Sequence, residues 1–249
     1  MGTENCSTEE SPSLRKRFSD EFFANARHFV YTSFIDHCRA PFVEEFMHKF
    51  DLSRSSANSA IHQMEKRHLC YTLQPTSKIF LANPFTSYQS SYRCSTVEND
   101  SKKTYFGSWP WDAIGIHFVV EKPCTLDLFC FHDGKPFAIH MDNFNWSAKN
   151  EPVFFFSLKF SQWYENLVDT WHNTINIFKS KSALQKYRSE NPEVKGEAVS
   201  MATIISLSHL FFRNRARKDF KPASLARIKS EFKKNHLSGP FWAIDKVKD

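Results

Sequence analysis

Apolar residues recur at three- and four-residue steps over residues 18–37, a spacing that places them on one face of a helix. The same periodicity predicts a second helix over residues 40–50 and a third helix that follows a serine cap. Two strand-like segments come next, at residues 68–73 and 78–82. Three helices followed by a hairpin are the winged-helix pattern, so residues 18–95 are predicted to form a winged-helix-like domain.

Apolar and polar positions alternate in the middle of the chain, which is typical of strands. Residues 125–131 and 136–141 are predicted to pair as a hairpin whose turn is residues 132–135. An aromatic strand is expected over residues 153–160. The preceding stretch, residues 83–104, is polar and rich in Ser and Asn, so we expect it to be a connector.

The helical period returns in the last third of the chain, at residues 180–191, 201–213 and 225–235. The fold class predicted from these patterns is α+β. Residues 1–17 are expected to be a disordered tail. Residues 96–249 are expected to form a second domain of mixed α and β structure that ends in helices.

The chain has an unusually high content of aromatic side chains. Of the 249 residues, 16% are Phe, Trp or Tyr, whereas only 6 are Gly. So few glycines argue against a glycine-rich phosphate-binding fold. Five of the 6 Trp fall in residues 96–178, so this segment holds more ring surface than a core requires. We therefore expect some of these rings to line a pocket.

The net charge and the cysteines indicate the partners and the cellular environment to expect. The net charge is +6, with the surplus of Lys and Arg in the last third, and it indicates a solvated surface rather than a nucleic-acid partner. The 6 cysteines show no metal-binding spacing. No secretory signal and no run of ~20 apolar residues is present, so we expect a cytoplasmic protein with free thiols and no membrane partner.

Several short motifs occur in an order that is informative as a set. They are Asn83-Pro84-Phe85, Trp111-Asp112-Ala113-Ile114-Gly115-Ile116, Asp133-Gly134-Lys135-Pro136, the loop over residues 191–197, and Gly239-Pro240-Phe241-Trp242. In this order the chain resembles the organomercurial (alkylmercury) lyase family over roughly residues 25–245. The resemblance implies an alkylmercury-lyase-like mixed α/β domain for residues 96–249 and a divergent member of the family.

The resemblance also implies a mechanism, in which two cysteine thiolates bind mercury and an aspartate delivers the proton that releases the alkane. Asp112 matches that aspartate, but Trp109 stands three residues before it, where the family has a cysteine. The second cysteine position is occupied by Trp171. An indole offers one N–H and no thiolate, whereas mercury capture needs soft ligands. We therefore expect no metal site and no mercury lyase activity.

The candidate catalytic residues are Asp112 and His172. Asp112 lies in an apolar, aromatic neighbourhood that should raise its pKa, as suits a general acid or base. The alternative is that Asp112 caps the apolar helix that follows it. His172 follows Trp171 directly and would serve as the acid/base partner. Residues expected to bind substrate are Trp109, Trp111, Trp171, Phe106 and His117, with burial in the core as the alternative for the tryptophans.

Two further thiols flank the predicted strand, Cys124 and Cys130. Residues six apart on an unbroken strand share a face but are separated by about 20 Å, so they are interpreted as buried thiols rather than a metal site.

These observations favour an enzyme that uses the lyase fold for metal-free acid/base chemistry, without a cofactor. The reaction would be an elimination, cyclisation, isomerisation or hydrolysis of a small, largely apolar organic molecule. Two alternatives stay open: a pseudoenzyme that binds a hydrophobic ligand, and a winged-helix regulator that binds DNA. The sequence leaves the oligomeric state open, a homodimer included.

Overall fold

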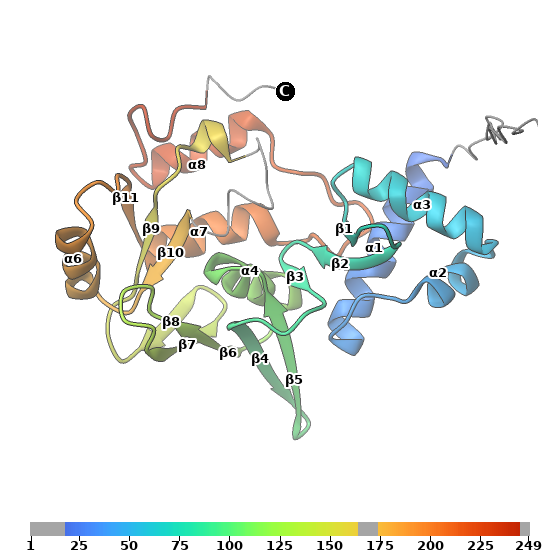
Figure 1. Ribbon diagram of the computed structural model, residues 1–249, viewed down its shortest axis with the longest axis horizontal. Coiled ribbons are helices and arrows are strands. Elements are labelled where there is room, and N and C mark those ends of the chain that lie inside the picture. The colour runs from blue at the N-terminus through green and yellow to red at the C-terminus, as the bar shows by residue number, and fades with distance from the viewer. Residues whose placement is uncertain (1–17, 164–173, 245–249) are drawn as a thin grey trace, which may run out of the picture.

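The computed structural model describes residues 18–163 and 174–244, and its first elements are three helices (Figure 1). Their bounds are Asp20–His37 for α1, Val43–Phe50 for α2 and Arg54–Lys66 for α3. Two of them begin at serine caps, because Ser19 Oγ accepts from the Phe22 N–H and Ser53 Oγ from the Ser56 N–H. The predicted second helix is also present, and Phe46 on its apolar face is buried.

A hairpin follows the three helices, as the sequence predicts. Strands β1 (Tyr71–Leu73) and β2 (Lys78–Ala82) pair antiparallel. The first strand begins later than expected, because α3 continues to Lys66 and His68 takes a left-handed conformation with φ 55° at the helix exit. The order of elements is therefore helix, helix, helix, hairpin.

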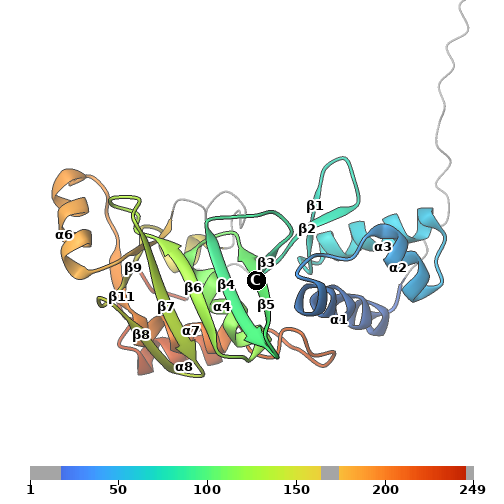
Figure 2. The ribbon, with the colours of Figure 1, turned by 90° about the horizontal axis from the view of Figure 1, so that it is seen from below.

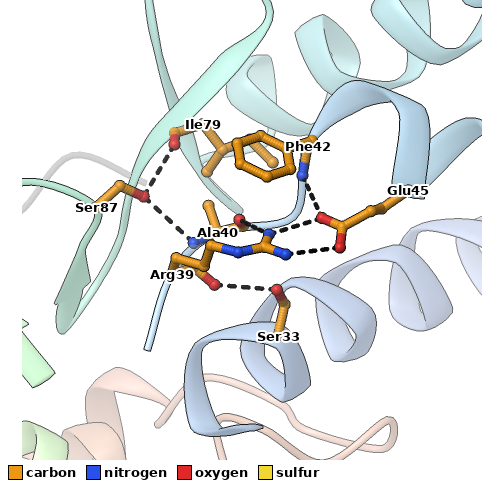
Figure 3. A network of polar contacts seen from close by, with 7 residues as sticks. All are labelled: Ser33, Arg39, Ala40, Phe42, Glu45, Ile79 and Ser87. Carbon is orange, nitrogen blue, oxygen red and sulfur yellow. Dashed lines mark hydrogen bonds and ion pairs between the residues drawn. The ribbon is translucent and has the colours of Figure 1, made fainter. Parts of the chain in front are cut away.

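A polar network ties the start of α2 to the rest of this region (Figure 3). The Arg39 guanidinium donates two hydrogen bonds of 2.7 Å to the Glu45 carboxylate. Glu45 also accepts from the Phe42 N–H at 2.7 Å, which satisfies a free donor at the helix start. The Ala40 N–H donates to Ser87 Oγ, just after β3, at 3.4 Å. The turn between α1 and α2 is thereby held against the sheet.

An eight-stranded antiparallel sheet runs from the hairpin into the middle of the chain, in the order β1-β2-β3-β5-β4-β6-β7-β8. Its other strands are β3 (Phe85–Thr86), β4 (Tyr92–Glu98), β5 (Ser101–Gly107), β6 (Cys124–Phe129), β7 (Pro136–Asp142) and β8 (Asn145–Ala148).

The connector predicted over residues 83–104 is wrong, because this stretch contributes β3, β4 and most of β5. Its Ser and Thr side chains hide the alternation that marks a strand. In β4, Cys94 is buried while Arg93 and Val97 are exposed. Since β4 also crosses the boundary placed between residues 95 and 96, the domain division stays a prediction.

The hairpin predicted around residues 132–135 is confirmed, with β6 and β7 paired in register. Gly134 occupies the turn with φ 63°, a conformation that suits glycine. A second sheet has the order β10-β9-β11 and is antiparallel throughout. Its strands are β9 (Val153–Phe156), β10 (Ile175–Phe178) and β11 (Glu197–Ser200), and a 3₁₀ turn, η1 (Phe160–Gln162), follows β9.

The helix α4 (Pro110–Val120) lies between the two sheets, and all of its 11 residues are buried. It packs against β4, β5 and β6 on one side and against α7 (Met201–Phe212) and β10 on the other. Figure 2 looks onto the large sheet, with α4 and α7 behind it. The remaining predicted helices are confirmed as α6 (Lys181–Glu190), α7 and α8 (Leu225–Lys234).

Across the described residues, no helix combines the length and apolar character that crossing a membrane requires.

The packing of α4 on α7 leaves no room for a side chain at Gly115. A Cβ there would lie 2.9 Å from the Phe212 ring. Gly115→Ala should lower the free energy of unfolding by about 1–2 kcal/mol, since overpacking outweighs the gain in helix propensity. Thermal or urea unfolding measures this change, with Gln185→Ala on the exposed face of α6 as the control. Equal or higher stability of Gly115→Ala would contradict the packing of α4 on α7.

Candidate functional site

Asp112 occupies the third position of α4, and only Ser108 and Trp109 separate this helix from β5. Trp109 is the N-cap residue, and Pro110 fills the first helical position, where no backbone donor is needed. The Asp112 carboxylate reaches back to accept from the Ser108 N–H at 3.1 Å. Gly107 makes this turn possible, because a Cβ there would lie 2.6 Å from the Asp112 Cβ. Asp112 therefore accepts a backbone hydrogen bond at the start of a buried helix. This role is close to the helix cap that the sequence predicts as the alternative.

The second oxygen of this carboxylate connects α4 to two distant segments. Asp112 Oδ1 accepts from Asn83 Nδ2 at 2.8 Å. The Arg215 guanidinium, just beyond α7, donates to Asn83 Oδ1 at 2.9 Å and to the Asn83 carbonyl oxygen at 2.8 Å. The same carbonyl accepts from the Tyr31 hydroxyl of α1 at 2.6 Å. Asn83 thus lies between the Arg215 guanidinium and the Asp112 carboxyl and links them through its own hydrogen bonds.

The electrostatic state of Asp112 follows from its burial. The side chain is 0% exposed. Desolvation raises the pKa of Asp112 well above its ordinary value, against the opposing effects of the Ser108 N–H, the Arg215 charge and the Asn83 amide. The sequence predicts this direction correctly.

The two described tryptophans of the predicted pocket are parts of the core. Trp109 is 3% exposed and Trp111 1%. Trp111 Nε1–H donates to Ser208 Oγ of α7 at 2.6 Å. Its ring makes edge-to-face contacts with Phe156 and Trp163, with centroids 5.7 and 5.5 Å apart. The core alternative for these tryptophans is therefore supported.

Two other predicted site residues, Phe106 and His117, do not lie beside Asp112. Phe106 of β5 is half-buried and lies on the opposite face of the strand from Gly107, whose backbone touches Asp112. His117 lies in the last turn of α4, where it contacts Cys124 instead. Trp171 and His172 lie outside the described residues.

Two residues of the Asp112 network, Asn83 and Arg215, were not among the predicted site residues. Asn83 belongs to one of the motifs that carry the resemblance, which is a signal that the sequence offered. Arg215 lies in a basic cluster at a helix end, where solvated cations are the usual arrangement. Its contact with Asn83 spans 132 positions of sequence, and no local pattern indicates it.

The cavities of the molecule lie elsewhere. A cavity of about 520 Å³ is lined by residues of β4, β6, β7 and β8 at one end of the large sheet. A second one, of about 380 Å³, lies beside α1 and α2. The residues that line these two cavities do not include Asp112, Trp109 or Trp111. The Asp112 carboxyl is enclosed by protein.

Comparison with protein families gives a match to the alkylmercury lyase model over residues 85–213. The chain belongs to the alkylmercury lyase family. The crystal structure of the mercury-bound form of MerB2 is similar in fold, with a TM-score of 0.55 at 13% identity, and the alignment covers 80% of this chain and 97% of that one. No curated protein matches the sequence of this lyase-family chain.

The buried carboxyl should leave a signature in the pH dependence of stability. An aspartate in an unfolded chain has a pKa of about 3.9, and burial raises that of Asp112. The folded chain therefore holds the proton more tightly, so the contribution of Asp112 to stability is fully present below pH ~4 and is lost as the pH rises through the folded pKa. The free energy of unfolding of the native chain minus that of Asp112→Asn, measured by urea unfolding, should decrease with rising pH.

Asp133→Asn is the matched control for this comparison. Lys179 lowers the pKa of Asp133 to about 2, so the corresponding difference should rise between about pH 2 and 4. A difference for Asp112→Asn that is flat, or that rises with pH, would contradict the buried carboxyl.

Proposed function

We propose that this lyase-family protein binds a small organic molecule and that its Asp112 site performs no chemistry. The enclosure of Asp112 carries the proposal. A general acid must come within hydrogen-bond reach of the reacting group. Asp112 is 0% exposed, and its two oxygens accept from Ser108 and Asn83. These contacts support a structural role for the carboxyl at the start of α4.

Mercury is not the substrate that this site would take. The related structure is described as mercury-bound, and capture of mercury depends on soft ligands such as thiolates. Trp109 occupies the family's first thiol position in this chain, and it is a buried N-cap residue. An indole supplies no thiolate. The position therefore contributes to folding rather than to metal capture.

The cavity lined by β4, β6, β7 and β8 is the site proposed for the ligand. Its volume of about 520 Å³ falls within the range of small-molecule sites, ~300–1,000 Å³. Val97, Met141 and Trp146 supply apolar surface in it. Thr125 and His140, which hydrogen-bond to each other at 3.0 Å, supply polar groups. Such a lining suits a flat, mostly apolar molecule with a hydroxyl or carbonyl group.

Ligand binding can be measured with 1-naphthol as the probe. Calorimetry should show saturable binding to the native chain. Ser147→Phe, which fills the cavity, should weaken binding at least about tenfold, or by ~1.4 kcal/mol. Ser182→Phe on the exposed face of α6 is the matched control and should bind as the native chain does. No saturable binding, or equal loss in both variants, would overturn the proposal.

The acid/base enzyme is the second candidate, and one observation favours it. The raised pKa of Asp112 keeps a proton on the carboxyl at a higher pH than usual, which suits an acid. Such chemistry requires the contacts of Asp112 with Ser108 and Asn83 to open so that a substrate can enter.

The two candidates differ in what Asp112→Asn does. A binding protein should release no product from a bound compound, as mass spectrometry would show, and Asp112→Asn should leave 1-naphthol binding unchanged. An acid/base enzyme should turn over a compound in the native chain and lose that turnover in Asp112→Asn.

For the N-terminal helices and hairpin we propose a winged-helix module that packs against the lyase domain. Three of its guanidinium groups are paired with carboxylates: Arg39 with Glu45 at 2.7 Å, Arg54 with Glu44 at 2.6 Å and Arg67 with Asp20 at 2.8 Å. Phosphate contacts would have to compete with these ion pairs.

The packing role predicts weak binding to nucleic acid. Fluorescence anisotropy with a short labelled DNA duplex should show no binding tighter than ~10⁻⁴ M at physiological salt. Tighter binding that weakens steeply as salt is added would instead support the DNA-binding alternative.

A further inference from the structure

Two thiols and an imidazole lie together where α4 ends and β6 begins. Cys124 Sγ is 3.4 Å from His117 Nδ1. The Cys94 thiol of the neighbouring strand β4 is close enough to Cys124 to affect the pKa of that thiol. Cys94 pairs with Leu126, so the two cysteines are diagonal neighbours on one face of the sheet. All three side chains are buried, with exposed fractions of 0% for Cys94, 2% for His117 and 8% for Cys124.

His117 is held in a way that favours its protonated form. Its Nδ1 lies 3.0 Å from the Lys122 carbonyl oxygen, and its Nε2 lies 3.0 Å from the Asn143 carbonyl oxygen. A neutral imidazole has one N–H, so one of these contacts would place two lone pairs against each other. The imidazolium donates to both carbonyls. A buried cation needs an anion beside it, and the neighbouring group that can supply one is the Cys124 thiol.

The electrostatics agree with an ion pair of thiolate and imidazolium. Cys94 has the largest influence on the pKa of Cys124. Cys94 and His117 together outweigh the effect of burial and lower this pKa to about 6. Burial lowers the pKa of His117, but the contacts with Cys124 and the two carbonyls raise it overall. The charge of His140 on β7 also favours the thiolate.

The surroundings of Cys94 complete this cluster. Burial, Cys124 and the Asp127 carboxylate raise the pKa of Cys94, which therefore stays a thiol and donates its S–H.

Cys124 also lies at the wall of the 520 Å³ cavity, together with Thr125, His140 and Trp146. We propose that Cys124 is a covalent modification site, at which its sulfur adds to small soft electrophiles, such as α,β-unsaturated carbonyl compounds, that enter this cavity. The proposal rests on the proposed function only in sharing its cavity. It does not involve Asp112.

The addition balances without any oxidant or metal. The thiolate electron pair forms a bond to the β-carbon of the electrophile, and the π pair of its C=C bond moves toward the carbonyl. The resulting enolate takes a proton from the His117 imidazolium, which leaves a thioether and a neutral imidazole.

Two other described thiols, Cys70 and Cys38, are poorer nucleophiles. Burial raises the pKa of Cys70 to about 12 and that of Cys38 above its ordinary value. Since the thiolate is the reacting form, these cysteines should react slowly near neutral pH. Selectivity for Cys124 is thus a measurable consequence of its contacts with His117 and Cys94.

Alkylation of the full chain by acrylamide, followed by peptide mapping in a mass spectrometer, tests the proposal. The rate at Cys124 should exceed that at Cys70 and Cys94 by more than tenfold at pH 7, with a pH–rate profile that inflects near pH 6. His117→Gln should shift the inflection toward ~8.5 and slow the reaction about tenfold at pH 6, because the thiolate fraction falls more than its nucleophilicity rises.

Two further variants guard against a merely structural effect. Cys94→Ala removes the other hydrogen bond and should also move the inflection upward. His132→Gln, at the distant β6–β7 turn, should leave it unchanged. A variant that has unfolded would react at Cys70 as fast as at Cys124, so the mapping itself identifies loss of the fold.

The outcomes separate this proposal from the proposed function. Fast alkylation of Cys124 without 1-naphthol binding supports the modification site and contradicts the proposed binding of an organic ligand. Binding of 1-naphthol with Cys124 no faster than Cys70 overturns the modification site alone. An inflection that does not move in both His117→Gln and Cys94→Ala also overturns it.

Discussion

The burial of α4 is the constraint on which the rest of the structure depends. All 11 of its residues are buried, including two that carry ionisable side chains, Asp112 and His117. A charge removed from water is costly unless hydrogen bonds or an opposite charge compensate for it. Each of these two side chains therefore needs hydrogen-bond partners on other segments of the chain. This requirement constrains where those segments lie. The helix is wholly apolar on its remaining positions, as a helix enclosed on all sides should be.

The two ends of α4 solve this problem in opposite ways. At the first turn, the Asp112 carboxylate accepts from the Ser108 and Asn83 N–H groups. At the last turn, His117 faces two carbonyl oxygens and a thiol. Positive charge is favoured near a helix C-terminus, so His117 agrees with the helix dipole, whereas burial keeps the proton on Asp112. The same buried helix thus separates a proton-holding carboxyl from an activated sulfur.

How far the sequence predicts this arrangement depends on the range of the contacts. Amphipathic helices such as α7 and the hairpin around Gly134 follow from local periodicity and turn chemistry. The direction of the Asp112 pKa also follows, because its neighbours in sequence are apolar. The strands β3 to β5 do not, since Ser, Thr, Lys and Arg interrupt their apolar positions, and such a sequence is typical of a connector. The contacts of Asn83 with Arg215, and of Cys94 with Cys124, join positions far apart and leave no local pattern.

Trp109 shows how a position of the family motif can serve packing in this chain. In the family motif, the position three before the aspartate carries a thiol, whereas here it carries a ring that is 3% exposed at the cap of α4. Pro110 and the reach of Asp112 to Ser108 satisfy the helix start without any help from that side chain. The ring is therefore free to contribute burial, worth roughly 2–3 kcal/mol for a large apolar side chain. At this turn the side chain before the helix contributes packing, while the carboxyl of Asp112 supplies the hydrogen bonds.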